Sequence, residues 1–179
     1  MQIKTYTLRE GDDLRSVTAS GANHVILDFR PTSAYCPTMI STHAGIIPDR
    51  SGNEMAACGE GAIVRIGMFA DEMPQNIITR VVNYQLDVVL LTGNESPTLI
   101  RNLRRTLDPT ALEPGTVREG TIRRGIQFWK QVDAGQAANL PLCGDYCHCV
   151  DALILDVADG DSVDGVNVYV QFGDFLLRF

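Results

Sequence analysis

The first residues that could do chemistry form the loop Thr92-Gly93-Asn94-Glu95, which follows the apolar run DVVLL and precedes Ser96-Pro97. The apolar run predicts a buried strand, and Ser-Pro predicts a helix start with serine as the N-cap and proline in the first turn. In α/β proteins, functional groups lie in loops between the carboxyl end of a strand and the next helix. Asp156 is placed similarly, because it ends the short apolar run that begins at Ala152. Both positions are therefore candidates for a site.

A second cluster of potential ligands is formed by Cys143, Cys147, His148 and Cys149 in the segment CGDYCHC. Thiols and imidazoles bind zinc, and Cys143 and Cys147 would share one face of a helix. The paired Cys-x-x-Cys spacing of a zinc knuckle is absent, however. We therefore expect no metal here and interpret these cysteines as small hydrophobic residues.

Apolar runs alternate with amphipathic stretches along the chain. The runs predict strands over 2–8, 24–29, 62–69, 88–91, 121–128 and 152–156. Helical spacing predicts helices over 9–20, with Gly21 as C-cap, from Asp71 through the stripe Ile77, Ile78, Val81, Val82 and Leu86, over 97–107, and over 133–140. Residues 30–60 are rich in Pro and Gly, and we expect them to be irregular apart from a possible helix over 53–58. Short apolar strands between amphipathic helices indicate parallel strands covered by helices.

Composition excludes several classes of function. The 179 residues are 45% hydrophobic, which is enough for one domain, 1–179, with its own core. The net charge of -7 and the pI of about 4.8 disfavour nucleic-acid binding. Arg101, Arg104 and Arg105 are basic at helical spacing, and we interpret them as a solvated helix face. The first strand is followed by Leu8-Arg9-Glu10-Gly11, which lacks a glycine-rich dinucleotide fingerprint.

Location is also constrained by the sequence. The opening MQIKTYTLRE has no apolar core of a signal peptide, and no apolar run is long enough to span a membrane. Five cysteines in a chain without an export signal indicate reduced thiols. We therefore expect a cytoplasmic protein.

Four segments resemble one protein family in the order in which they occur. The stretch RIGMFADEMPQNIITRVVNYQLDVVLLTGNESPTLIRNLRRTLDP resembles a Val-Gly-Val-Phe-Val strand, a helix and a Gln-Leu-His-Gly-Asx-Glu loop. ANHVILDFRPTSAYC resembles a second strand with a Tyr-Pro-Lys-Ser-Pro-Arg-Tyr loop, and VDALILDV resembles a sixth strand. IKTYTLRE resembles the opening Ile-Lys-Val-Cys-Gly-Met-Arg-Glu. The family is phosphoribosylanthranilate isomerase, a (β/α)8-barrel enzyme of tryptophan biosynthesis.

This resemblance implies an Amadori rearrangement by acid–base chemistry, without a cofactor. The family's general acid, an aspartate that ends the sixth strand, matches Asp156. The cysteine that serves as general base falls at Tyr6, and the arginine that meets the anthranilate carboxylate falls at Tyr35. The histidine of the fourth-strand loop falls at Thr92, and the glycine after it is retained as Gly93.

Because several of these working groups are replaced, we expect weak or no isomerase activity. A phenol, with a pKa near 10, is a poor base at neutral pH. We interpret Tyr6 as an aromatic plug of the barrel mouth, with a phenolic acid–base role as the alternative. For Asp156 two interpretations stay open: a retained general acid, or a polar residue that caps its strand.

The end of the chain is expected to depart from the family. A complete barrel has eight βα units, and this chain shows about six, which indicates a truncated homologue: barrel-like units over 1–157 and a divergent tail over 158–179. The family's Gly-Gly-Ser-Gly-Lys loop would lie near 164–168. The tail alternates at Val166, Val168, Val170 and Phe172, and Gly173-Asp174 suits a tight turn, so we expect a hairpin or a frayed helix.

Two alternative functions stay open. In the first, a partner chain supplies missing strands and phosphate loops to an active isomerase that takes a phosphorylated small-molecule substrate. In the second, the chain is a non-catalytic binding or assembly module. Its partner would then be another copy of the chain or a protein of the tryptophan pathway.

Overall fold

A computed structural model describes residues 4–8, 12, 17, 19–33, 39–42, 45–48, 63–111, 121–133, 140–158, 166–172 and 175–178. The chain divides into two compact units, Met1–Val89 and Leu90–Phe179. One sheet has the strand order β1-β2-β5-β6-β7-β8-β9-β10, and β3 and β4 form a separate pair. Strand β6 (Val88–Leu91) has the predicted bounds and contains the boundary between the units.

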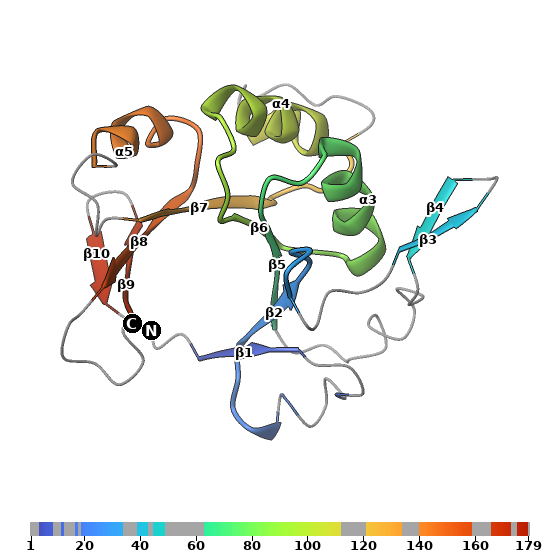
Figure 1. Ribbon diagram of the computed structural model, residues 1–179, viewed down its shortest axis with the longest axis horizontal. Helices are drawn as coiled ribbons and strands as arrows, with labels where there is room; N and C mark the ends of the chain where they lie inside the picture. The colour runs from blue at the N-terminus through green and yellow to red at the C-terminus, as the bar shows by residue number, and fades with distance from the viewer. Residues whose placement is uncertain are drawn as a thin grey trace. The chain divides into compact units, whose positions relative to one another are not determined.

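The first unit is built on parallel strands. Strand β1 (Thr5–Thr7) pairs with β2 (His24–Asp28), and β2 pairs with β5 (Val64–Phe69). Figure 1 shows these strands in blue and green. Gly21, before β2, has a φ of 84°, as expected of a helix C-cap glycine.

Helix α3 (Pro74–Tyr84) follows β5 and packs on one face of it. On that face Phe29 stacks on Phe69, with ring centroids 5.2 Å apart, and meets Tyr84 at 5.0 Å. The Arg80 guanidinium lies 4.5 Å from the centre of the Phe29 ring, and its Nη1 donates to the Phe29 carbonyl at 3.2 Å. The aromatic cluster joins the end of β2 to the helix.

The bounds and the buried face of α3 correct two predictions. The helix begins at Pro74 with Met73 as N-cap, whereas Asp71 has a φ of 50° and lies outside the helix. Val82 is 52% exposed, because it is turned by one helical step from the buried Val81. The buried face is completed by Arg80 and Tyr84, which the search for apolar residues passed over.

The predicted irregular region contains a hairpin, β3 (Met39–Thr42) paired antiparallel with β4 (Gly45–Pro48). The prediction was wrong over these residues, because the short runs MIST and GIIP are strand-like but lie among many prolines and glycines. The helix suggested over 53–58 lies outside the described residues.

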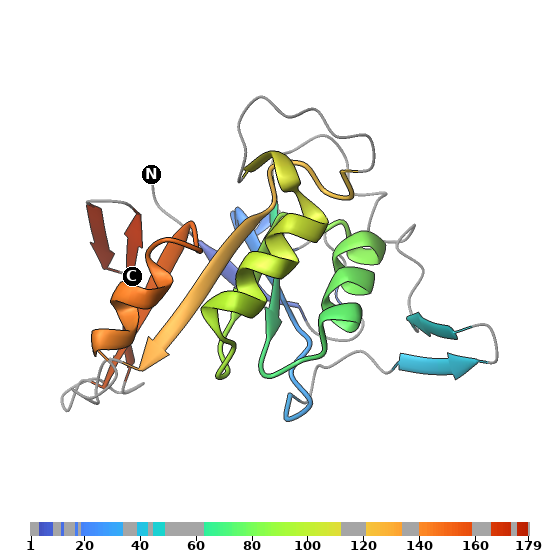
Figure 2. The same cartoon turned by 90° about the horizontal axis from the view of Figure 1, so that it is seen from above.

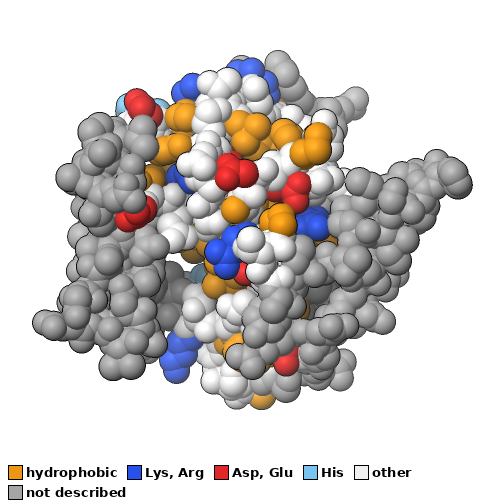
Figure 3. Space-filling view, in the orientation of Figure 1, with side chains coloured by type: hydrophobic (Ala, Val, Ile, Leu, Met, Phe, Trp, Pro, Cys, Tyr) orange, Lys and Arg blue, Asp and Glu red, His pale blue; other side chains and the backbone are white. Residues whose placement is uncertain are grey.

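The second unit begins with helix α4 (Pro97–Leu107), whose bounds are as predicted. The Ser96 Oγ accepts a hydrogen bond from the Leu99 N–H at 3.2 Å, which confirms the N-cap. Figure 2 shows α4 alongside strand β7 (Gln127–Asp133). Arg104 of α4 lies 5.1 Å from the Phe128 ring and is buried, so the prediction that it belongs to a solvated face was wrong. The exposed Arg101 and Arg105 do fit that prediction, and basic side chains lie along the top of Figure 3, where α4 runs.

Two further elements are displaced from their predicted positions. The fifth strand was expected over 121–128, but 122–125 form turns in which Ile122 and Arg123 donate backbone hydrogen bonds to the Leu107 carbonyl. Gly125 has a φ of 76° there, which a strand does not accommodate. Helix α5 (Leu140–Tyr146) begins where the helix expected over 133–140 was to end. A short 3-10 turn, η1 (Pro109–Ala111), follows α4.

The predicted C-terminal hairpin is confirmed, and the helix alternative was wrong. Strand β8 (Ala152–Ala158) runs parallel to β7. Strand β9 (Val166–Phe172) pairs antiparallel with β8 and with β10 (Phe175–Arg178). Figure 1 shows the three strands in orange and red. Strand β9 therefore occupies the edge of β8 that β7 leaves open.

These elements confirm the expected fold class: an α/β protein, an incomplete (β/α)8 arrangement of about six βα strands in chain order, followed by a hairpin. Within the part of the chain that the structure describes, no helix has the length and apolar character needed to cross a bilayer.

Candidate functional site

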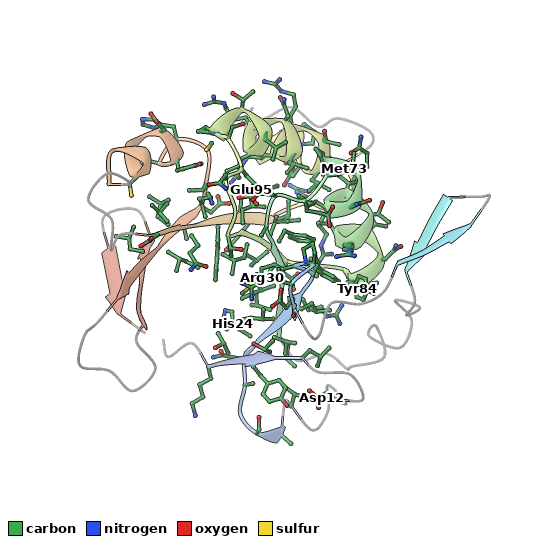
Figure 4. All side chains as sticks on the ribbon, viewed as in Figure 1. Asp12, His24, Arg30, Met73, Tyr84 and Glu95 are labelled. Atoms are coloured by element: carbon green, nitrogen blue, oxygen red, sulfur yellow. The ribbon has the colours of Figure 1, made fainter. Side chains whose placement is uncertain are left out.

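The loop Thr92–Glu95 lies at the carboxyl end of β6, immediately before α4, where the sequence predicted it (Figure 4). Thr92 and Gly93 are half-buried, whereas Glu95 is 4% exposed. A nearly buried carboxylate requires a partner. The partner of Glu95 is therefore the group that holds this loop in place.

That partner is Lys130, in the middle of β7. Its Nζ donates to Glu95 Oε2 at 3.2 Å, to the Gly93 carbonyl at 2.5 Å and to the Leu91 carbonyl at 3.4 Å. An ammonium has three N–H donors, so all of them are used. The side chains of Lys130 and Glu95 are 3% and 1% exposed. The carbonyls of Leu91 and Gly93, the residues on either side of Thr92, are thus fixed by one buried cation.

Tyr146, at the end of α5, completes this group. Its hydroxyl donates to the Glu95 carbonyl at 2.8 Å, and its ring lies 5.6 Å from the Lys130 ammonium. Burial raises the pKa of Tyr146, and the neighbouring Glu95 carboxylate adds to the increase. The phenol therefore stays protonated and acts as a donor. We call Glu95, Lys130 and Tyr146 the loop clamp.

The two faces of β7 differ in character. Side chains alternate along a strand, so Phe128 and Lys130 share one face. On this face Phe128 contacts Arg104 of α4, and Lys130 contacts Glu95. Trp129 and Asp133 share the other face, and Asp133 is exposed at the carboxyl end of the strand. In the register of β7 with β8, Asp133 is the partner of Asp156. The backbone therefore brings two aspartates to the same level of neighbouring parallel strands.

Asp156 lies within β8, two residues before its end at Ala158, rather than at the last position. Its register partner on the other side is Val168 of β9. The expected glycine-rich loop near 164–168 is replaced in part, because 166–168 belong to β9.

In the first unit, Asp28 and Arg30 form the main polar pair at the carboxyl end of β2. Asp28 is buried and accepts from Arg30 Nε at 2.9 Å and Nη2 at 2.7 Å, and from the Arg30 N–H at 3.1 Å. Burial by itself raises the pKa of Asp28, but the hydrogen bonds from Arg30 and Ser33 outweigh it and hold the pKa below its usual value. The Arg30 side chain is 38% exposed, whereas that of its partner Asp28 is 7% exposed.

Tyr6 lies in the middle of β1 and is half-buried. Its hydroxyl donates to Asp12 Oδ2 at 3.1 Å, and Figure 4 shows Asp12 beside β1. In the register of β1 with β2, Tyr6 is the partner of Val25, whereas Thr7 is the partner of Ile26. Tyr6 therefore shares a face with Val25, and the exposed Thr7 lies on the opposite face. Its roles as plug or acid–base group stay predictions.

Tyr6 and Val25 lie on the face of the sheet that packs on α3. Val25 and Phe29 lie on the same side of the chain, by strand alternation, and Phe29 packs against Tyr84 and Arg80 of that helix. Asp28 lies on the opposite side, as Thr7 does. Tyr35, expected to replace the carboxylate-binding arginine, lies outside the described residues.

The cysteine segment shows graded exposure. Cys147 is exposed, Cys143 is half-buried and Cys149 is buried. Burial raises the pKa of the Cys143 and Cys149 thiols, so both resist ionisation. Among the described residues, no group of three or more His, Cys, Asp or Glu side chains is placed to hold a metal ion.

Sequence reasoning missed the clamp and the Asp28–Arg30 pair. Lys130 carried a signal, because a charged residue inside the apolar run FWKQV is rarely buried without a partner. The misplacement of β7 over 121–128 hid that signal. The identity of the partner could not be read from the sequence, because Glu95 is 35 residues away.

Comparison with known proteins agrees with this arrangement of strands and helices. No family model matches the chain. An N-(5'-phosphoribosyl)anthranilate isomerase of Paramagnetospirillum magneticum is 22% identical over 156 residues, which are 87% of this chain and 60% of that protein. At this low identity, the chain is similar in sequence to this isomerase. It spans about three fifths of the length of this curated relative.

Solved structures show the same fold. The phosphoribosyl anthranilate isomerase of Thermotoga maritima matches with a TM-score of 0.59 at 19% identity, over 90% of this chain and 64% of that one. The enzyme of Thermus thermophilus matches with a TM-score of 0.56 at 21% identity, over 90% and 65%. An isomerase in complex with reduced 1-(O-carboxyphenylamino)-1-deoxyribulose 5-phosphate matches with a TM-score of 0.58 at 18% identity, over 88% and 66%.

Proposed function

We propose that this chain is a phosphoribosylanthranilate isomerase-like protein of tryptophan biosynthesis, cytoplasmic, whose own isomerase activity is weak or absent. The likeness in sequence and fold supports the first part of the proposal. The substrate in this proposal is the phosphorylated aminoaldose that the family rearranges. Asp156 is the proposed general acid.

The observation that carries the proposed loss of activity is the placement of Tyr6. The family's reaction needs a base opposite the acid, and the resemblance puts that base at Tyr6. Here the phenol hydrogen-bonds Asp12 and shares a face with Val25, the face that packs on α3. A hydroxyl that donates its proton to a neighbouring carboxylate is not placed to accept a proton from a substrate.

The arrangement of β9 bears on the alternative in which a partner completes the barrel. Strand β9 pairs with β8 from Leu153 to Ala158, along almost all of its length. A partner that adds a parallel strand to β8 must first displace β9. This pairing supports the proposal that no partner strand is added at this edge of β8. The non-catalytic assembly module is the second candidate function.

The test is turnover of phosphoribosylanthranilate by the purified chain, followed as loss of the anthranilate fluorescence of the substrate. We expect no turnover above the buffer rate. The matched control is Asp156→Asn, which keeps the size of the side chain and removes its acid. Turnover in the wild-type chain that disappears in Asp156→Asn would show an active isomerase and contradict the proposal.

A further inference from the structure

We propose that Lys130 is a positioning residue. Through the buried loop clamp, it sets the conformation of the Thr92-Gly93 segment, which follows the carboxyl end of β6. The inference rests on the proposed function only for the ligand that this segment would meet. The conformational claim itself depends on the contacts of the described residues alone.

The Lys130 ammonium makes three hydrogen bonds to one short segment of the chain. Lys130 Nζ reaches the carbonyls of Leu91 and Gly93, which flank Thr92, and the carboxylate of Glu95 at the end of the loop. Three points within five residues are therefore tied to one atom of a neighbouring strand. A loop held in this way loses most of its alternative conformations.

Stability alone does not account for the buried Lys130–Glu95 pair. Removing two ions from water costs several kcal/mol per ion, and apolar pairs of similar volume are often at least as stable. Lys130 and Glu95 are nonetheless almost fully buried. What an apolar pair cannot provide is donors for the two backbone carbonyls, whose positions define the loop.

The loop clamp also holds the loop from a second element, α5. Tyr146 of α5 donates to the Glu95 carbonyl, so a second element fixes the last residue of the loop from its own side. Glu95 precedes Ser96, the N-cap of α4, whose side chain accepts from Leu99. The segment is thereby anchored at Leu91, Gly93 and Glu95 and at the N-cap of α4, and Thr92 lies between the first two anchors.

The experiment measures amide hydrogen exchange over residues 91–99 in the wild-type chain and in Lys130→Met. We expect exchange in this segment to rise about tenfold, which corresponds to the loss of about one buried hydrogen bond, while the β2 and β5 segments change little. Lys130→Arg, which keeps the charge and the donors, should restore part of the protection. The matched control is Arg104→Met, which removes a buried cation of the same unit whose ion pair is with Asp151.

A second variant guards against unfolding, because Lys130→Met removes the Lys130 ammonium from the buried Glu95 carboxylate. The double variant Lys130→Met/Glu95→Leu removes both charges but still lacks donors for the two carbonyls. We expect it to recover global stability in urea and to keep fast exchange over 91–99. Normal protection in the double variant, or equal increases in all strands of Lys130→Met, would overturn the proposal.

Binding of reduced 1-(o-carboxyphenylamino)-1-deoxyribulose 5-phosphate, measured by titration calorimetry, connects the clamp to the proposed function. Weaker binding in the stable double variant than in the wild-type chain is the expected result. If the wild-type chain does not bind this compound, the proposed substrate class fails while the exchange result still decides the role of Lys130. If both bind equally, Lys130 does not position the ligand-facing segment.

Discussion

Arg104 of α4 and Asp151, which immediately precedes β8, form an ion pair in which Nη2 lies 2.5 Å from Oδ2. The same oxygen accepts the Phe128 backbone N–H at 2.7 Å. One carboxylate therefore connects α4, β7 and the start of β8. The side chain of Arg104 is 8% exposed and that of Asp151 is 36% exposed, so the two partners are unequally buried.

This inequality predicts unequal losses of stability. Asp151→Ala leaves the Arg104 guanidinium buried without its carboxylate, and we expect a loss of about 3 kcal/mol in the free energy of unfolding. Arg104→Met leaves a partly hydrated carboxylate, and we expect a loss of about 1 kcal/mol. Urea unfolding of both variants checks the order. A larger loss in Arg104→Met would show that packing on Phe128, rather than charge, dominates this contact.

The Asp28–Arg30 pair predicts a dependence of stability on pH. The pKa of Asp28 is lowered in the folded chain, so its contribution is fully present above the pKa of an unfolded aspartate, about 3.9, and is lost as the pH falls through the lower folded value. At pH 7, Asp28→Asn should cost about 1.5–3 kcal/mol, the range for hydrogen bonds to a charged group.

Urea unfolding of the wild-type chain and Asp28→Asn between neutral and acid pH measures this contribution. The difference in unfolding free energy between the two proteins should shrink as the carboxylate is protonated. A difference that stays constant at low pH would mean that Asp28 acts through its shape and neutral hydrogen bonds, not through its charge.

Two glycines predict opposite effects of adding a methyl group. A Cβ at Gly67 of β5 would clash with Leu86 Cδ1 and lie 2.8 Å from Phe69 Cε2, so we expect Gly67→Ala to cost about 1–3 kcal/mol of stability through overpacking. A Cβ at Gly144 of α5 meets nothing within 4 Å, and Gly144→Ala should add about 0.5–1 kcal/mol. Thermal unfolding of the two variants gives the signs directly, and a stabilising Gly67→Ala would show that the side chains around it move aside.

Placing cysteine at position 6 should not produce turnover of phosphoribosylanthranilate. Tyr6 shares the face of Val25, so a thiol at this position faces away from the side on which Thr7 and Asp28 lie. The fluorescence assay of Tyr6→Cys should remain at the buffer rate. Measurable turnover would mean that only the base is missing and that the strand face is not the obstacle.

Thiol accessibility gives this prediction an independent control. Thr7 is exposed, whereas Tyr6 is half-buried. Alkylation by iodoacetamide, read at each site by mass spectrometry, should therefore be faster for Thr7→Cys than for Tyr6→Cys. The reverse order would contradict the assignment of the two faces of β1.

The sequence by itself determined the elements whose signals are local. The bounds of β6 and α4 were predicted because an apolar run, an N-cap serine and a proline act within a few residues of one another. The C-terminal hairpin was one of two alternatives that the sequence left open, and the strand pairing decided between them. The resemblance to the isomerase family also came from the sequence alone, since ordered segments carry it over most of the chain.

Tertiary structure decided the contacts between distant residues and the faces on which side chains lie. Lys130 finds Glu95 across 35 residues, and no local rule pairs a cation with one of many possible carboxylates. The face of Tyr6 depends on the register of β1 with β2, because a slip of one residue would move the phenol to the other side. Register and burial depend on how the whole sheet packs, so a short stretch of sequence does not specify them.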